Sequence, residues 1–146
     1  MTYPDINAVV GKLGGSGVLR AQVRTLPELS RVVREGLPLR SLYKVAERFP
    51  AAHQRRVEQL IAPRSTLQRR EESGVLSAEE SQRLERVARL VALAEQVWES
   101  EQTALDWLTA PHPHFDGEAP LDVGATELGA RRVEELLWKL EHSLPV

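Results

Sequence analysis

A run of basic and polar side chains directly after Pro63 has the chemistry of a nucleic-acid contact. Arg and Gln donate hydrogen bonds to phosphate oxygens and base edges, and Ser and Thr make shorter contacts of the same kind. Short helices predicted on both sides of Pro63 are compatible with a helix-turn-helix, whose second helix enters the major groove. The candidate DNA-contacting residues are Arg64, Ser65, Thr66, Gln68, Arg69 and Arg70. Many solvated helices carry the same residue types, so chemistry alone leaves both interpretations open.

Two histidines, His112 and His114, stand close to Asp116 and could in principle bind a metal ion. The chain has no cysteine, and no paired ligand motif follows the histidines. We therefore expect a surface turn in this Pro-containing loop, with no metal site and no cofactor.

Adjacent glutamates do not form a catalytic pair in this sequence. Glu79 and Glu80, like Glu134 and Glu135, occupy neighbouring helix positions that point in different directions, so we expect them on solvated faces. There is no nucleophile elbow, no phosphate-binding Gly loop followed by Lys, and no zinc-enzyme helix motif. These observations favour a protein that is not an enzyme.

Helices must position these side chains, because apolar residues recur at helical spacing and strand-like alternation is scarce. We therefore predict an all-α fold. The expected helices cover about residues 4–12, 27–35, 38–49, 51–61, 65–73, 77–98, 100–109 and 126–142. The glycine-rich stretch 14–17 is predicted to be a flexible linker or a helix stop, and residues 110–124 a loop rich in Pro and Gly.

The strongest helix signal lies in the middle of the chain. Ser77 and Glu80 have the spacing of a capping box, in which each side chain bonds to the other residue's backbone N–H. Apolar residues continue at helical spacing as far as Trp98, so this helix is expected to form the centre of the core. Trp98 and Trp107 are expected to be core anchors. Trp138 lies at the edge of an apolar stripe and could help to form a partner-binding surface.

Charge is divided unevenly along the chain. The net charge of the 146 residues is -2, yet residues 1–74 contain 13 Lys and Arg against 7 Asp and Glu, whereas residues 75–146 contain 6 against 14. This asymmetry suggests two surfaces with different partners, the first suited to phosphate and the second to a cationic surface. Random variation of surface charge is the alternative.

Composition favours a globular protein of the cytoplasm. Apolar residues make up 42% of the chain, which is enough for a core, and the lack of cysteine rules out disulfides and thiolate metal sites. Residues 1–17 contain Pro, Asp and Gly where a signal peptide needs an unbroken apolar stretch. No uncharged run reaches the length of a membrane span, which is about 20 residues, so we expect no membrane partner.

The order and spacing of several short motifs resemble those of the Xre/MbcA/ParS antitoxins. The resemblance covers about residues 60–146. The motifs that carry it are Pro63–Arg70, Gly74–Leu76, Glu80–Leu84, Ala104–Leu108, Gly117, Pro120–Asp122, Thr126–Arg131, Leu136–Leu137 and Glu141–His142.

This resemblance implies two domains. Residues 1–74 would form an Xre-like DNA-binding and dimerisation domain with a helix-turn-helix, and residues 75–146 a small three-helix toxin-binding domain. The implied partners are a RES-domain toxin that consumes NAD or ADP-ribosylates a protein, the operator DNA of the protein's own operon, and a second copy of the chain. Such an antitoxin has no enzymatic activity and occludes the active site of the toxin.

By position in the family, the last helix and tail would contact the toxin. A cavity that binds the phosphates of NAD needs cationic side chains, and carboxylates could occupy the places of the phosphates. The candidate toxin-binding residues are Arg131, Glu134, Glu135, Trp138, Glu141, His142, Leu144, Pro145 and Val146. Ser143 stands where the family commonly has Gly, which leaves the path of the tail open.

A second hypothesis comes from another functional class. The chain could be a stand-alone helix-turn-helix transcription regulator whose C-terminal domain senses a ligand or a partner. The loop at residues 110–124 would then cover a small-molecule pocket.

Overall fold

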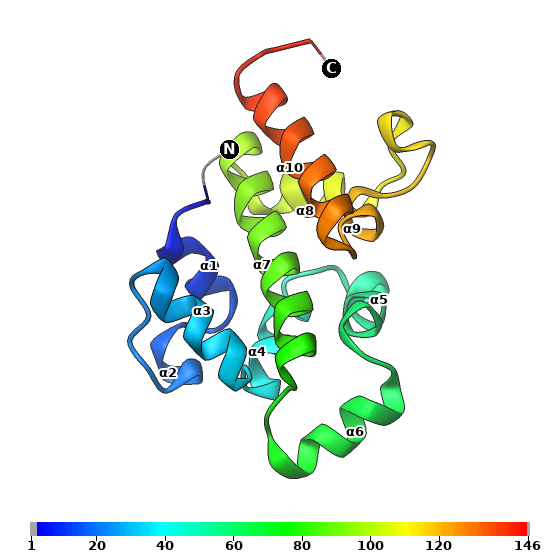
Figure 1. Ribbon diagram of the computed structural model, residues 1–146. Helices are drawn as coiled ribbons and strands as arrows, with labels where there is room; N and C mark the ends of the chain where they lie inside the picture. The colour runs from blue at the N-terminus through cyan, green and yellow to red at the C-terminus, as the bar shows by residue number, and fades with distance from the viewer. Residues whose placement is uncertain (1–2, 146) are drawn as a thin grey trace.

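One long helix, α7 (Ala78–Trp98), runs through the middle of the protein and carries most of the other helices on its sides (Figure 1). The computed structural model describes residues 3–145. Every named element within this range is helical, and β pairing is limited to an isolated bridge between Pro38 and Val75. The prediction of an all-α fold is confirmed.

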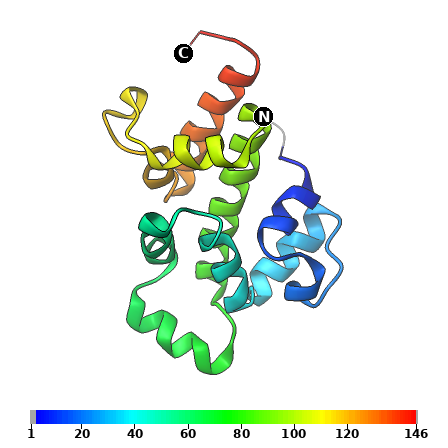
Figure 2. The same ribbon diagram turned by 180° about the vertical axis from the view of Figure 1, so that it is seen from behind.

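Six helices precede α7. They are α1 (Ile6–Lys12), α2 (Gly15–Leu19), α3 (Leu26–Glu35), α4 (Leu39–Ala46), α5 (Ala51–Ile61) and α6 (Arg64–Ser73). α1, α3, α4 and α5 pack against α7, whereas α6 projects at the end of the molecule farthest from the C-terminus (Figures 1 and 2).

The elements that follow α7 gather around its other end. They are α8 (Glu101–Thr109), the short 3-10 helix η1 (Pro113–Phe115), α9 (Pro120–Val123) and α10 (Glu127–Glu141). α8 and α10 both pack against α7, and α9 joins them to each other (Figure 2). α6 and α10 therefore lie at opposite ends of one helix.

The helices on both sides of α7 share one hydrophobic core. Leu42 before α7, Leu90 within it and Leu108 after it are all 0% exposed and belong to the same cluster of buried side chains. Because the cluster is continuous, neither half of the chain has a separate core of its own.

Local signals set the start of α7 as expected. The Ser77 hydroxyl accepts a hydrogen bond from the backbone N–H of Glu80 at 3.1 Å, and the Glu80 carboxylate accepts one from the backbone N–H of Ser77 at 2.8 Å. This confirms the predicted capping box. Thr25 and Glu28 form a second capping box at the start of α3.

Two stretches expected to be irregular contain helices. Of the two alternatives predicted for residues 14–17, the helix stop is confirmed, because α1 ends at Lys12 before Gly14, and the flexible linker is wrong, because α2 begins at Gly15. Gly14 and Gly15 have φ of 110° and 76°, which lets the chain reverse after α1, and Leu19 anchors the new helix by burial.

The second such stretch, residues 110–124, was expected to be a loop but contains η1 and α9. Both begin with a proline, whose fixed φ suits the first position of a helix. Phe115 and Leu121 are each only 1% exposed, so burial of apolar side chains holds the two short helices in place.

None of the described helices combines the length and the apolar character that a bilayer span requires.

The contact between α9 and α10 depends on a glycine. A Cβ atom added at Gly129 would lie 1.7 Å from the carbonyl oxygen of Val123 and 3.0 Å from the Thr126 hydroxyl oxygen. Thr126 caps α10 by accepting a hydrogen bond from the Gly129 N–H. A side chain at position 129 would therefore push α10 away from the preceding turn.

We predict that Gly129→Ala lowers the free energy of unfolding by about 3 kcal/mol, because overpacking displaces backbone here and not merely a flexible side chain. Gly11→Ala is the control. It lies inside α1 with no atom within 4 Å of the added Cβ, and it should raise the free energy of unfolding by about 0.5–1 kcal/mol. Urea denaturation followed by circular dichroism measures both; equal effects would show that the Gly129 contact is relaxed in solution.

Candidate functional site

The first candidate site is the helix pair α5–α6. α5 ends at Ile61, Ala62 has extended backbone with φ of -163° and ψ of 157°, and Pro63 is the N-cap of α6. The two helices are thus joined by a two-residue turn, as predicted for a helix-turn-helix. Ile61 and Leu67 are buried and anchor the two helices in the common core.

α6 presents most of its predicted contact residues to solvent. Arg64, Ser65, Gln68 and Arg69 are exposed, and Thr66 is half-buried. The Arg69 guanidinium donates a hydrogen bond to the Thr66 hydroxyl at 3.2 Å, which is within α6 itself. These side chains are placed where a polyanion could reach them.

Arg70 is placed differently from the other candidates. Its guanidinium donates two hydrogen bonds to the Glu80 carboxylate, from Nε to Oε1 at 2.9 Å and from Nη2 to Oε2 at 3.0 Å. This bidentate geometry is the strong form of an Arg–carboxylate pair. The guanidinium that was predicted to contact DNA is therefore already bound within the chain.

The expectation that Glu80 lies on a solvated face is wrong. Glu80 is 5% exposed, because its carboxylate serves both the capping box of α7 and the ion pair with Arg70. The Arg70 hydrogen bond holds the pKa of this carboxyl below its ordinary value of 4.5. The spacing of Ser77 and Glu80 predicted the capping box, but it did not indicate that Glu80 would also bind Arg70.

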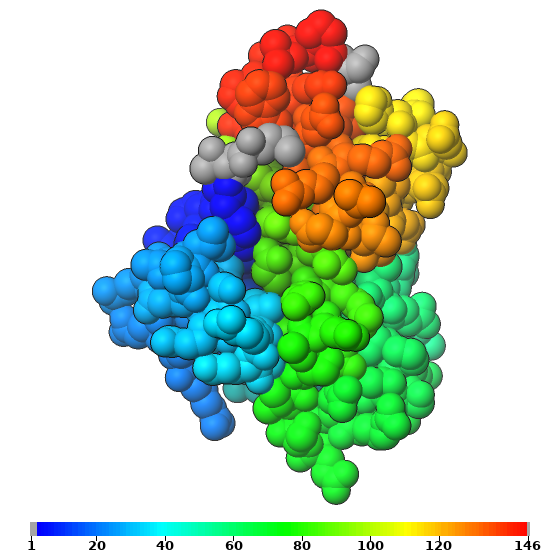
Figure 3. Space-filling view, in the orientation of Figure 1, coloured from blue at the N-terminus to red at the C-terminus, as the bar shows by residue number. Residues whose placement is uncertain are grey.

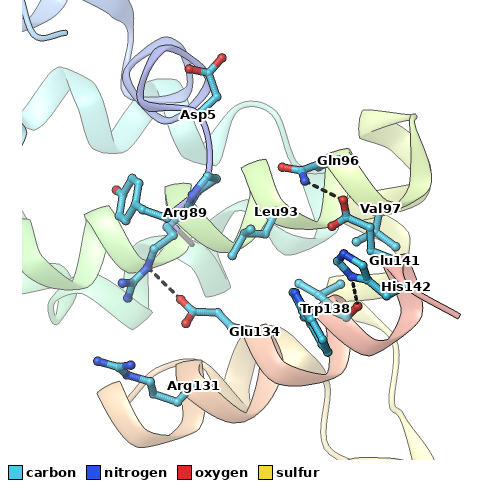
Figure 4. Close-up of a pocket in the computed structure, with 13 residues that line it drawn as sticks. Asp5, Arg89, Leu93, Gln96, Val97, Arg131, Glu134, Trp138, Glu141 and His142 are labelled. Carbon is cyan, nitrogen blue, oxygen red and sulfur yellow. Dashed lines mark hydrogen bonds and ion pairs between the residues drawn. The ribbon is translucent and has the colours of Figure 1, made fainter. Parts of the chain in front are cut away.

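The second candidate site is a groove of about 500 Å³ between α7 and α10, closed on one side by the segment before α1 (Figure 4). Five of the predicted toxin-binding residues line it. They are Arg131, Glu134, Trp138, Glu141 and His142. The structure thus brings together side chains that the sequence places on one helix and adds a facing wall from α7.

Arg89 of α7 lies at one end of this groove and faces three carboxylates. Its Nε is 3.1 Å from Oε1 of Glu134 (Figure 4). The same Nε is 3.5 Å from Oε2 of Glu85, and Nη2 is 3.6 Å from Oε2 of Glu127. The side chains of Arg89 and Glu134 are only 14% and 13% exposed. The expectation of a solvated Glu134 is therefore wrong, and burial raises its pKa.

The N-terminal segment is joined to the same group of charges. The Tyr3 hydroxyl donates a hydrogen bond to the Glu85 carboxylate at 2.6 Å, and the Arg89 guanidinium lies over the Tyr3 ring. Burial and the neighbouring Glu85 carboxylate raise the pKa of the Tyr3 hydroxyl, so it stays protonated and remains a donor.

At the other end of the groove the side chains are more open. Trp138 is 41% exposed, and its ring lies 4.4 Å from the ring of His142, centroid to centroid. The side-chain amide of Gln96 donates a hydrogen bond to the Glu141 carboxylate at 2.8 Å (Figure 4). An exposed indole beside a groove is the kind of side chain that dominates protein–protein interfaces.

The remaining predicted toxin-binding residues lie outside the groove. Glu135 is exposed and lies 3.4 Å from Nζ of Lys139. Leu144 and Pro145 are exposed beyond the helix, and Val146 lies outside the described residues.

Ser143 ends α10 in the way a glycine would. Its φ of 54° is left-handed, its N–H donates to the Leu140 carbonyl at 3.3 Å, and the Leu144 N–H donates to the Lys139 carbonyl at 2.8 Å. These two bonds form a Schellman motif. The replacement of Gly by Ser therefore leaves the end of the helix intact.

One exposed apolar residue of α10 was missed by the sequence reasoning. Leu128 is 80% exposed. It lies seven residues before Glu135 and so belongs to the polar side of the helix. A leucine on a polar stripe is the signal that could have identified it.

Basic residues of the N-terminal half neutralise part of the acidic half. Residues 90–130 contain eight Asp and Glu but no Lys or Arg. Lys12 bonds to Glu95 and Glu101, and Arg48 bonds to Glu101 at 2.7 Å. The charge asymmetry thus serves contacts within the chain as well as surfaces for partners.

The two histidines considered as metal ligands lie in η1 and at its start. His112 accepts a hydrogen bond from the His114 backbone N–H, and its ring lies 5.7 Å from those of Trp107 and Phe115. The described residues contain no group of three His, Asp or Glu arranged to hold a metal ion.

Comparison with known proteins finds two family domains, and each contains residues of one candidate site. Residues 28–89 match the antitoxin Xre-like helix-turn-helix domain, and residues 93–142 match the antitoxin Xre/MbcA/ParS C-terminal toxin-binding domain. Antitoxin Xre of Pseudomonas putida is 32% identical over 113 residues, which are 77% of this chain and 70% of that protein. The chain therefore belongs to the Xre antitoxins and is the antitoxin of a toxin-antitoxin system, with a helix-turn-helix domain and a toxin-binding domain.

Proposed function

We propose that this antitoxin neutralises a RES-domain toxin by occluding its active site with α10 and the tail, and that it represses its own operon through α6. The observation that carries the proposal is the exposed Trp138 beside the groove of α10, inside the segment that matches a toxin-binding domain. The toxin would be an enzyme that degrades NAD or ADP-ribosylates a protein. The antitoxin itself acts as a regulator without enzymatic activity.

The exposed side chains of α10 offer both apolar and acidic contacts. Trp138 and Leu128 are the exposed apolar residues of the helix, and the Glu135 and Glu141 carboxylates are also exposed. A cavity that binds NAD phosphates is cationic, so these carboxylates could replace the phosphates there. Glu134 contributes less to this charge, because Arg89 faces its half-buried carboxylate within the chain.

The DNA side of the proposal uses α6 as the recognition helix. Arg64 and Arg69 are exposed cations that could bind phosphates, and Gln68 and Ser65 have side chains that could reach base edges. α6 and α10 lie at opposite ends of α7 and on one face of the molecule they are well separated (Figure 3). One antitoxin could therefore hold DNA and toxin without direct competition.

Three further parts of the proposal concern organisation. We place the DNA-binding and dimerisation functions in residues 1–74 and the toxin-binding function in residues 75–146. A homodimer formed through the N-terminal region would suit an operator with two half-sites. A cytoplasmic location would give access to both operator DNA and the toxin. Membership of the antitoxin family argues against the alternative of a stand-alone transcription regulator.

We predict that Trp138→Ala weakens toxin binding at least tenfold, because a central aromatic anchor is worth about 2 kcal/mol or more at an interface. Calorimetric titration of the toxin from the adjacent gene into the antitoxin measures the affinity, and co-expression measures rescue of growth. A chain cut after residue 125 should give no rescue.

Arg69→Ala is the matched control for this experiment, since it removes an exposed side chain at the other end of the molecule and should leave toxin binding unchanged. If the full chain fails to rescue growth, or if Trp138→Ala binds as tightly as the wild type, occlusion by α10 is the wrong mechanism.

We also predict that Arg64→Ala and Arg69→Ala each weaken operator binding and reduce the slope of log K against log salt by about 1. Each variant loses one phosphate contact, so fewer counterions are released when the DNA binds. Fluorescence anisotropy with a labelled promoter fragment at several salt concentrations gives the slopes. Arg132→Ala on α10 is the control with an unchanged slope. Slopes at the wild-type value for both Arg64→Ala and Arg69→Ala would show that α6 does not contact the DNA.

A further inference from the structure

α6 has few side chains that fix its direction. Leu67 is its one buried residue, and the rest of the helix projects from the body at the lower end of the molecule (Figures 1 and 3). A helix held by a single apolar side chain could tilt about its two ends. Polar contacts must therefore help to set its angle to α7. One of them is exposed and long: the Tyr43 hydroxyl of α4 donates a hydrogen bond to the Glu71 carboxylate of α6 at 3.4 Å.

The C-terminal end of α6 is fixed by the backbone. Gly74 adopts φ of 73° and stops the helix, and its carbonyl accepts a hydrogen bond from the Leu39 N–H at 2.9 Å. The Leu76 N–H donates to the Leu37 carbonyl at 2.8 Å, and the Leu37 N–H donates to the Ser81 hydroxyl at 2.7 Å. These bonds hold the turn between α6 and α7 but leave the tilt of α6 itself unset.

Arg70 supplies a connection between the body of α6 and α7. Its two hydrogen bonds to Glu80 join a side chain near the end of α6 to the first turn of α7. Glu80 is itself held, because it is buried and its Oε1 also accepts the Ser77 N–H. A bidentate pair with one rigid partner restricts rotation as well as distance.

The neighbouring arginine provides a contrast. Arg69 is exposed, and its guanidinium donates a hydrogen bond to Thr66 of the same helix, so this contact does not restrain the tilt of α6. Of these two adjacent arginines, Arg70 is therefore bound to α7, whereas Arg69 faces solvent.

We infer that Arg70 is a positioning residue: it sets the angle of α6 through Glu80 and acts on DNA binding without contacting phosphate. The inference rests on the proposed binding of operator DNA by α6. Electrostatic attraction alone would make a chain without the Glu80 carboxylate bind DNA more tightly, whereas the positioning role predicts the opposite. Removal of the negative charge of Glu80 should weaken binding to a polyanion, because the loss of position outweighs the gain in net positive charge.

The test compares Arg69→Gln, Arg70→Gln and Glu80→Gln in the full-length chain. Operator affinity is measured by anisotropy between about 50 and about 200 mM salt, the range in which phosphate contacts are most visible. We expect all three variants to bind at least fivefold more weakly at low salt. The slope of log K against log salt should fall by about 1 for Arg69→Gln and stay at the wild-type value for Arg70→Gln and Glu80→Gln.

Hydrogen exchange of the free chain supplies a readout that does not involve DNA. The amides of α6 should exchange faster in Arg70→Gln and Glu80→Gln than in the wild type, and at the wild-type rate in Arg69→Gln. Arg70→Lys keeps the charge but loses the bidentate geometry, so its α6 amides should exchange at a rate between those of Arg70→Gln and the wild type. Unchanged toxin affinity shows that α10 and the core remain folded.

The pH dependence checks the pair itself. Because the pKa of Glu80 is lowered in the folded state, its stabilising contribution is complete above the ordinary value of 4.5 and is lost as the pH falls below it. The stability difference between the wild type and Glu80→Gln should therefore shrink as the pH falls below 4.5.

Two results would overturn the inference. One is a slope for Arg70→Gln that falls by about 1 together with an unchanged or tighter affinity for Glu80→Gln, which would make Arg70 a phosphate contact. The other is α6 exchange at the wild-type rate in both Arg70→Gln and Glu80→Gln. If Arg69→Gln changes neither affinity nor slope, the proposed DNA contact by α6 fails, and the exchange rates still decide the role of Arg70.

Discussion

The structure depends on α7 as a support shared by both halves of the chain. Its side chains are buried against helices that precede it and against helices that follow it, within one continuous core. Buried Lys12 of α1 adds ion pairs to Glu95 of α7 and Glu101 of α8, so the two halves are joined by charge as well as by apolar contact. The helix pair α5–α6 and the helix α10 are therefore both joined to the same long helix.

Ion pairs formed by α7 link it to the helices that we propose to meet the partners. Glu80 in its first turn holds Arg70 of α6, and Arg89 farther along faces Glu134 of α10. In each pair the carboxylate is mostly buried, so loss of its arginine would leave a carboxylate poorly solvated and with less compensation for its charge. The exposed charges that remain, such as Arg69 on α6 and Glu135 on α10, are available to other molecules.

Sequence reasoning predicted what local patterns determine. The capping box of Ser77 and Glu80, the helix from Ala51 to Ile61 and the short turn at Pro63 all follow from spacing within a few residues. The pairs Arg70–Glu80 and Arg89–Glu134 could not be predicted, because their members meet only when separate helices pack. The helix α2 was missed for a related reason: burial of Leu19 by the core outweighs the low helix propensity of its glycines.

Our central claim is that α10 meets the toxin while α6, at the other end of α7, remains free for DNA. A crystal structure of the antitoxin bound to its toxin tests this claim most directly. We predict that Trp138 lies inside the cavity that holds the NAD of the toxin and that Arg64 and Arg69 face solvent. A toxin seated on α6, or an empty cavity with Trp138 in solvent, would contradict the claim.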